Sequence, residues 1–278
     1  MDYIQLNLNG EESVRELITA ELFAIGIDSV NETDLLLAYI EKHLFNDDFI
    51  VKLQALCEKY NYNYTAEALA NINWNAEWES SFNPVRIRDY CLIKASFHKV
   101  EEEFQHTIEI NPKMSFGTGH HETTWLMMDK ISQLNITEKK VLDYGCGTGI
   151  LAILAEKELA KDIDAIDIDP LCVGNTTENL EINACQRISI LLGDLNILRV
   201  SKKYDLILAN INRKVLLSNA DLLAEFLVAD GDLLLSGILE TDKNIVLDRY
   251  KTAGFKLEEI NQRGEWLCIH FTKSTNSL

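Results

Sequence analysis

The sequence of 278 residues lacks long apolar runs, cysteine pairs and clustered basic side chains. No apolar run approaches the roughly 18 residues of a membrane-spanning helix, and the N-terminus has neither the basic segment nor the apolar stretch of a signal peptide. The six cysteines are scattered without a CxxC pair or a Cys/His cluster, which argues against a disulfide framework or a zinc site. We therefore expect a cytoplasmic protein with reduced thiols, no metal and no membrane partner.

Basic residues are also few: the chain has 26 Lys and Arg against 44 Asp and Glu, which gives a net charge of −18. Binding to nucleic acid requires clustered Lys and Arg, and the longest basic stretches here are pairs such as Lys139-Lys140. The charge argues against direct binding to bare RNA or DNA. It favours a small neutral ligand or a basic macromolecular partner.

What the sequence does contain is typical of a folded protein with two domains. The 47% share of hydrophobic residues suits a packed core, and the length predicts two domains. Residues 1–68 run in the order strand, helix, two short apolar runs, helix and extended segment, which is the β-α-β-β-α-β order of a ferredoxin-like fold. A fold of this size commonly recognises a partner and seldom performs chemistry alone.

Two tryptophans mark the segment that follows, residues 69–82. Trp74 and Trp78 are four residues apart and would share one face of a helix. We expect a short linker helix that packs between the domains, and a contact with substrate is the alternative interpretation.

From residue 83 to residue 278, predicted strands alternate with amphipathic helices, which indicates a parallel, doubly wound sheet. Two closing strands, 255–260 and 266–271, flank a turn at Arg263-Gly264 and add an antiparallel hairpin. The expected fold class is α/β, with a small α+β domain in front. The other predicted strands are 141–143, 163–167, 188–192, 204–209 and 232–236, and the helices lie near 149–159, 171–183, 214–228 and 241–253.

A glycine-rich turn after the first of these strands is the strongest chemical signal. Gly145, Gly147 and Gly149 form GxGxG between a strand and a helix, where glycines let the backbone approach a ligand closely. A dinucleotide fingerprint would read GxGxxG. Asp143 precedes the turn, and a carboxylate there opposes an anionic pyrophosphate but tolerates a cationic sulfonium amino acid. The alternative is a glycine-rich loop without a ligand.

Polar residues end the next three strands. Asp167 follows Gly149 by 18 residues and is expected to accept hydrogen bonds from ribose hydroxyls. Asp194 is predicted to face an adenine amino group. Asn210 ends the fourth strand, where methyltransferases that act on planar nitrogens carry Asn-Pro-Pro-aromatic. None of the three prolines follows Asn210, which favours an aliphatic target nitrogen, and the alternative role for Asn210 is a turn or C-cap residue.

The segment 116–124 is predicted to form a lid followed by the start of a helix near His121. Adjacent histidines on a helix point about 100° apart and are poor metal ligands, so a lid over the reactive centre is the better interpretation. Thr124 is expected to offer a hydroxyl group to the ligand. The lid residues are Phe116, Gly117, Thr118, Gly119 and His120.

Six blocks of the second domain together resemble the ribosomal protein L11 methyltransferase family (PrmA type). The FGTGHHETT sequence of the predicted lid is the most specific of them, whereas the glycine turn occurs in many methyltransferases. The resemblance covers about residues 70–278, including the tryptophan pair. The blocks are 116–124, 145–150, 167–170, 209–211, 236–238 and 264–266.

This resemblance implies a class I fold that depends on S-adenosylmethionine and trimethylates amino groups of the ribosomal protein, namely lysine side chains and the N-terminal amine. It also implies that the first domain captures this basic substrate, which we expect in its free form. The family differs from this chain before the lid, where Asn111-Pro112-Lys113-Met114-Ser115 replaces Asp-Pro-Gly-Met-Ala. Family positions that bind the cofactor match Thr124, Gly145, Asp167 and Asn210.

The predicted mechanism is direct in-line transfer to an unprotonated amine, with Asn210 aiming the lone pair and no residue standing out as a general base. Three alternatives stay open from the sequence. The chain is also compatible with a methyltransferase of another protein or a small amine, and with a non-catalytic cofactor-binding module. A dehydrogenase is the third alternative, weakened by the GxGxG spacing.

Overall fold

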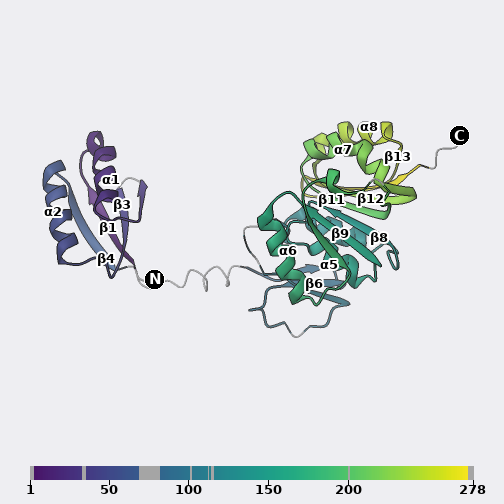
Figure 1. The fold of residues 1–278 in the computed structure, drawn as a ribbon, viewed down its shortest axis with the longest axis horizontal. Helices are drawn as coiled ribbons and strands as arrows, with labels where there is room; N and C mark the ends of the chain where they lie inside the picture. Colours follow the sequence, from purple (N-terminus) through teal and green to yellow (C-terminus); the bar gives the residue numbers. More distant parts are fainter. Residues whose placement is uncertain are drawn as a thin grey trace. The chain divides into compact units, whose positions relative to one another are not determined.

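A computed structural model describes residues 3–32, 36–68, 82–100, 102–111, 113, 116–199 and 201–274. The chain forms two compact units, Met1–Phe82 and Asn83–Leu278 (Figure 1). The predicted linker helix lies outside the described residues except for Phe82. Within the described ranges, no helix is both long enough and apolar enough to cross a bilayer.

The first unit is a four-stranded antiparallel sheet with two helices, in the strand order β2-β3-β1-β4 (Figure 1). Alternate residues of β1 are buried, as expected for a sheet with one covered face. Asn46 begins α2 by accepting a hydrogen bond from the Phe49 N–H at 3.1 Å. The elements are β1 (Tyr3–Asn9), α1 (Arg15–Ala24), β2 (Ser29–Glu32), β3 (Leu36–Glu41), α2 (Asp47–Tyr60) and β4 (Asn63–Ala68).

The second unit is built on a seven-stranded sheet in the order β10-β9-β8-β11-β12-β14-β13. The five neighbouring strands β10, β9, β8, β11 and β12 run parallel. Strand β14 of the terminal hairpin pairs antiparallel with β12 and with β13. This confirms the predicted doubly wound sheet with a terminal hairpin. The strands are β8 (Lys140–Tyr144), β9 (Asp162–Asp167), β10 (Ile188–Leu192), β11 (Tyr204–Asn210), β12 (Leu227–Leu239), β13 (Phe255–Arg263) and β14 (Trp266–Lys273).

Both faces of this sheet are covered by apolar cores. On β11, Leu206 and Leu208 belong to one buried cluster, and Ile207 and Ala209 belong to the other. Successive residues of a strand point to opposite faces, which is why a doubly covered strand is apolar throughout. The helices are α4 (Glu122–Ile131), α5 (Ile150–Lys157), α6 (Pro170–Ile182), α7 (Arg213–Phe226) and α8 (Lys243–Thr252).

A small sheet precedes α4 and was not predicted from the sequence. It has the order β5-β6-β7, with β5 and β6 antiparallel and β6 and β7 parallel. Its strands are only three or four residues long, too short to show a clear alternation. They are β5 (Val85–Ile87), β6 (Cys91–Lys94) and β7 (His106–Glu109).

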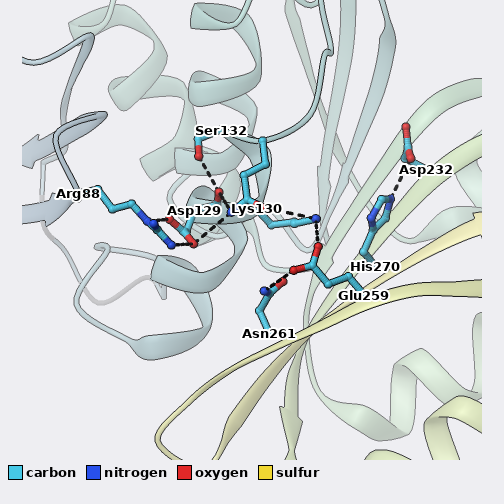
Figure 2. A network of polar contacts seen from close by, with 9 residues as sticks. Arg88, Asp129, Lys130, Ser132, Asp232, Glu259, Asn261 and His270 are labelled. Carbon is cyan, nitrogen blue, oxygen red and sulfur yellow. Dashed lines mark hydrogen bonds and ion pairs between the residues drawn. The ribbon is translucent and has the colours of Figure 1, made fainter.

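Charged side chains fix the second half of α4 (Figure 2). Asp129, 5% exposed, accepts two hydrogen bonds from the guanidinium group of Arg88, one of them at 3.0 Å. The next residue, Lys130, is 6% exposed and forms an ion pair with Glu259 of β13. The helix is thus attached to the turn after β5 and to the terminal hairpin. Its other end, at His121, lies at the cavity described next.

Candidate functional site

A cavity of about 420 Å³ lies at the carboxyl ends of the parallel strands β8, β9 and β11. This is the edge at which open α/β sheets bind ligands, and the volume falls within the roughly 300–1,000 Å³ of small-molecule sites. The structure brings five predicted site residues together on its wall. They are Phe116, Gly145, Gly147, Asp167 and Asn210.

The glycine turn requires glycine at each of its three positions. Gly145 and Gly147 have φ angles of 75° and 57°, and a Cβ atom there would lie 2.2 Å from Ile211 Cγ2 and 2.4 Å from the Phe116 carbonyl oxygen, respectively. Gly149, with φ of 78°, begins α5 and lies outside the cavity lining. The first two glycines therefore leave backbone facing the cavity. The third lets α5 begin in a left-handed conformation close to Thr176 of α6.

Asp167 at the end of β9 is the only carboxylate among the lining residues that the structure describes. Its Oδ2 accepts a hydrogen bond from the Gly147 N–H at 3.0 Å, and its Oδ1 accepts one from the Asp169 N–H at 3.0 Å. These bonds attach the carboxylate to the glycine turn and to the start of α6. Each oxygen keeps a lone pair, so the predicted contact with ribose hydroxyls is sterically and chemically available.

Asn210 lines the cavity and has one unpaired amide atom. Its Nδ2 donates to Thr124 Oγ1 at 3.4 Å, while its Oδ1 is buried and has no partner among the described protein atoms. Thr124 is fully buried and does not line the cavity. The hydroxyl group of Thr124 holds the Asn210 amide, and a direct contact of Thr124 with the ligand stays a prediction.

Asp143 is also placed differently from the prediction. It lies 1% exposed beneath the glycine turn, outside the cavity lining, and its Oδ2 accepts from the Ala152 N–H of α5 at 3.1 Å. Its Oδ1 has no partner. Burial, with a smaller contribution from the negative charge of Asp167, raises the pKa of this carboxyl group to about 7.

Asp194 does not reach the cavity, because it begins a short 3₁₀ helix, Leu195–Ile197. Its Oδ1 accepts from the Asn196 backbone N–H at 2.9 Å and from the Asn196 side chain at 3.0 Å. Gly193, with φ of 144°, turns the chain just after β10. Asp194 thus caps the 3₁₀ helix, and its contact with an adenine amino group stays a prediction.

The predicted lid is attached to the glycine turn. The Phe116 carbonyl accepts from the Thr148 N–H at 3.0 Å, and the Gly117 carbonyl accepts from Thr148 Oγ1 at 2.6 Å. Thr118 contacts the His120 ring at 3.2 Å, and His120 Nε2 lies 2.9 Å from the Asn83 carbonyl oxygen. Phe116 lines the cavity, while the other four predicted lid residues lie outside its lining: Gly117, Thr118, Gly119 and His120.

Sequence reasoning missed the aromatic side of the wall. His121 and Trp266 have ring centroids 4.8 Å apart, and His121 lies 5.2 Å from the Phe116 ring. His121 Nδ1 accepts from the Thr123 N–H at 3.3 Å and so caps α4. The paired histidines and the Gly-Glu-Trp block were visible in the sequence, but Trp266 reaches His121 only because β14 pairs with β12 in the folded sheet.

The charge of the wall limits which ligands fit. Of the lining residues that the structure describes, none is Lys or Arg, and the wall is mainly apolar. An anionic pyrophosphate would face Asp167 without a cation, whereas a cationic ligand would be favoured. Elsewhere in the described chain, no three His, Cys, Asp or Glu side chains are grouped as a metal site.

Comparison with known proteins agrees with this geometry. The sequence profile of a family described as "Ribosomal protein L11 methyltransferase (PrmA)" matches residues 8–274. The chain belongs to this family. The predictions of family, methyltransferase activity, class I fold and S-adenosylmethionine as cofactor are thereby confirmed.

Named members of the L11 methyltransferase family cover nearly the whole chain. One from Porphyromonas gingivalis is 40% identical over 268 residues, which cover 94% of this chain and 91% of the relative. One from Phocaeicola vulgatus is 35% identical over 264 residues, with 94% of each chain covered. A solved structure, described as ribosomal protein L11 methylase from Lactobacillus delbrueckii subsp. bulgaricus, is 27% identical. It covers 70% of this chain and 100% of its own, with a TM-score of 0.65.

The residues present fit the cofactor of the family. Gly145 and Gly147 line the cavity without side chains, so only backbone faces a ligand there. Asp167 supplies acceptor oxygens for ribose hydroxyls and a negative charge that attracts the cationic sulfonium group. We therefore assign the cavity to S-adenosylmethionine.

Proposed function

We propose that the protein transfers methyl groups from S-adenosylmethionine to amino groups of ribosomal protein L11, at lysine side chains and the N-terminal amine. The names of the relatives support the substrate. The structural observation that carries the chemistry is Asn210 on the cavity wall, whose buried Oδ1 has no partner among the described protein atoms. We infer that this amide turns its oxygen to an N–H of an incoming amine and so orients the lone pair of the amine.

The bound cofactor supplies an electrophilic methyl group. Asn210 is held in one orientation by Thr124, so its Oδ1 fixes the direction from which an amine enters. The amine reacts only after it loses a proton, because a lysine amine has a pKa of about 10.4 and an α-amine about 7.7 to 8. The apolar wall favours this loss, since desolvation lowers the pKa of an amine. We assign Asp167, the one carboxylate among the described lining residues, to the ribose hydroxyls, so the proton passes to solvent.

Charge supports the capture of a basic substrate by the first unit. Residues 1–82 contain 15 acidic and four basic side chains, a net charge of −11 out of the −18 of the whole chain. A concentrated negative charge accelerates association with a basic protein. We propose that this unit binds free L11 without direct contact to nucleic acid. The cytoplasmic location stays a prediction.

The test is to incubate the full-length protein with S-adenosylmethionine and purified L11 and to weigh the product. Stepwise gains of methyl mass on the ribosomal protein support the proposal. L11 with acetylated amines is the matched control and should gain no mass. Unmodified L11 beside an enzyme that binds S-adenosylhomocysteine would contradict the proposed substrate but not the cofactor.

A further inference from the structure

Helix α6 carries asparagines at a four-residue spacing, and the mechanism above does not use them. Asn175 and Asn179 are 2% and 0% exposed, and Asn183 ends the helix. Asparagine is a poor helix former, and a buried amide costs free energy unless its hydrogen bonds are satisfied. Their partners therefore indicate what this face of the helix does.

The three amides pair with the backbone of one extended segment, β7 and the two residues after it. Asn183 accepts from the Glu109 N–H at 3.0 Å and donates to the Glu109 carbonyl at 2.6 Å. Asn179 Oδ1 accepts from the Asn111 N–H at 2.8 Å, and Asn175 donates to the Asn111 carbonyl at 3.1 Å. Among the described strands β7 lies at the edge of its sheet, and side chains of the helix bond to its free side.

Asn179 also bonds to the glycine turn, a contact not found for Asn175 or Asn183 among the described residues. Its Nδ2 donates to the Thr148 carbonyl at 2.9 Å, inside the glycine turn. Thr148 is fully buried, and its N–H and hydroxyl group bind the carbonyls of Phe116 and Gly117. The Asn179 amide therefore joins two segments. One is Asn111, which precedes the 116–121 loop in the chain, and the other is the glycine turn against which this loop packs.

We propose that Asn179 is a positioning residue for the cofactor site. It completes a ring of contacts from Asn111 through Asn179 and Thr148 to Phe116, and four residues of chain separate Phe116 from Asn111. The ring fixes the 116–121 loop against the glycine turn, and Phe116 and Gly147 from these two segments share the cavity wall. The inference rests on the assignment of the cavity to S-adenosylmethionine.

The ring requires both an acceptor and a donor on the Asn179 side chain. Its Oδ1 accepts from the incoming segment and its Nδ2 donates to the turn, so a carboxylate, which keeps the acceptor but loses the donor, breaks the link to Thr148 and sets a charged oxygen against the Thr148 carbonyl oxygen. Asn179→Asp is such a change. Asn183→Asp is a matched control on the same helix, because Asn183 bonds to Glu109 and to the Asn179 carbonyl but not to the glycine turn.

The experiment uses full-length wild type, Asn179→Asp and Asn183→Asp. Calorimetric titration with S-adenosylhomocysteine measures binding, and amide hydrogen exchange of the unliganded protein measures protection of residues 116–121 and 145–149. We expect Asn179→Asp to bind about tenfold more weakly and to exchange faster in both segments, because the buried Thr148 carbonyl loses its donor. Asn183→Asp should bind within about twofold of wild type even where its melting temperature falls equally.

Equal weakening in the two variants, or unchanged binding by Asn179→Asp, would overturn the inference. If Asn179→Asp does not fold, Asn179→Ala removes the bonds to both Asn111 and Thr148 without adding a charge, and unchanged affinity and exchange in that variant would refute the positioning role. Wild-type protein that does not bind S-adenosylhomocysteine would instead contradict the cofactor assignment.

Discussion

Asn210 at the end of β11 and Thr124 in the first turn of α4 are joined by a hydrogen bond of 3.4 Å from amide to hydroxyl. The bond joins two elements 86 residues apart in sequence and leaves Asn210 Oδ1 unpaired on the cavity wall. Thr124 is fully buried, so its hydroxyl group has no solvent to compete for it. The helix thereby sets the direction in which the amide oxygen points.

The first prediction follows for Asn210→Ala. Loss of the oxygen that aims the amine should lower the single-turnover rate with L11 by about 100-fold, with a change of less than about threefold in the dissociation constant of S-adenosylhomocysteine. Thr124→Val, which no longer holds the amide, should lower the rate about tenfold, whereas Thr124→Ser keeps the acceptor and should not. Losses of rate and binding that are equal in Asn210→Ala would contradict this division of roles.

The second prediction concerns Asp167→Asn. The variant keeps one acceptor oxygen but loses the charge and sets an NH₂ group against the N–H of Gly147 or Asp169. Calorimetry should show S-adenosylhomocysteine binding weakened at least about tenfold. Asp169→Asn is the matched control, because Asp169 begins α6 and asparagine caps a helix equally well. If Asp169→Asn weakened binding as much as Asp167→Asn, the loss of affinity would come from a change at the start of α6 and not from a contact of Asp167 with the ligand.

Much of this site followed from the order of the strands. Gly145, Asp167 and Asn210 end parallel strands, and the carboxyl ends of such strands meet at one edge, so local sequence was sufficient to group them. Asp194 shares that pattern, but it also caps a 3₁₀ helix and does not line the cavity. A carboxylate near a strand end can bind a neighbouring backbone N–H or a ligand, and the sequence does not show which contact is favoured.

Other parts of the site depend on long-range packing. Trp266 reaches His121 only because β14 lies beside β12, and no spacing in the sequence measures that distance. Asp143 was predicted to face the ligand because it adjoins the glycine turn. The side chains of successive strand residues point to opposite faces, however, and the face of Asp143 is closed by α5.

The third prediction concerns substrate capture by charge. If the acidic first unit attracts L11, the KM for L11 should rise steeply between low and physiological salt, since screening weakens exposed charges. The dissociation constant of S-adenosylhomocysteine should change little, because its cavity is mainly apolar. A KM for L11 that is independent of salt would contradict electrostatic capture and leave the cofactor site unaffected.

The fourth prediction compares the two partners of a half-buried ion pair. Lys130 is 6% exposed, and Glu259 opposite it is accessible to solvent (Figure 2). Glu259→Gln leaves an ammonium group buried without a carboxylate and should lower the free energy of unfolding by about 1–3 kcal/mol. Lys130→Met removes the buried charge and keeps the length of the side chain, so it should lower the free energy of unfolding by less than Glu259→Gln does. Urea unfolding measures both, and a larger loss in Lys130→Met would show that Coulombic attraction outweighs desolvation here.

The last prediction uses the buried carboxyl group of Asp143. Burial raises its pKa to about 7 from an ordinary value of 3.8, so the folded protein holds this proton more tightly than the unfolded chain does. The stabilisation is complete below about pH 4 and is lost as the pH rises through 7. The size of the effect is on the order of 4 kcal/mol.

Asp143→Asn keeps an oxygen for the Ala152 N–H and cannot titrate. The free energy of unfolding of this variant, minus that of wild type, should therefore rise between pH 4 and 7 and level off above 7. Asp169→Asn, at an exposed carboxylate, measures the effect of removing one negative charge in general. Parallel stability curves for Asp143→Asn and wild type across pH 4 to 7 would show that Asp143 is ionised in the folded protein throughout that range.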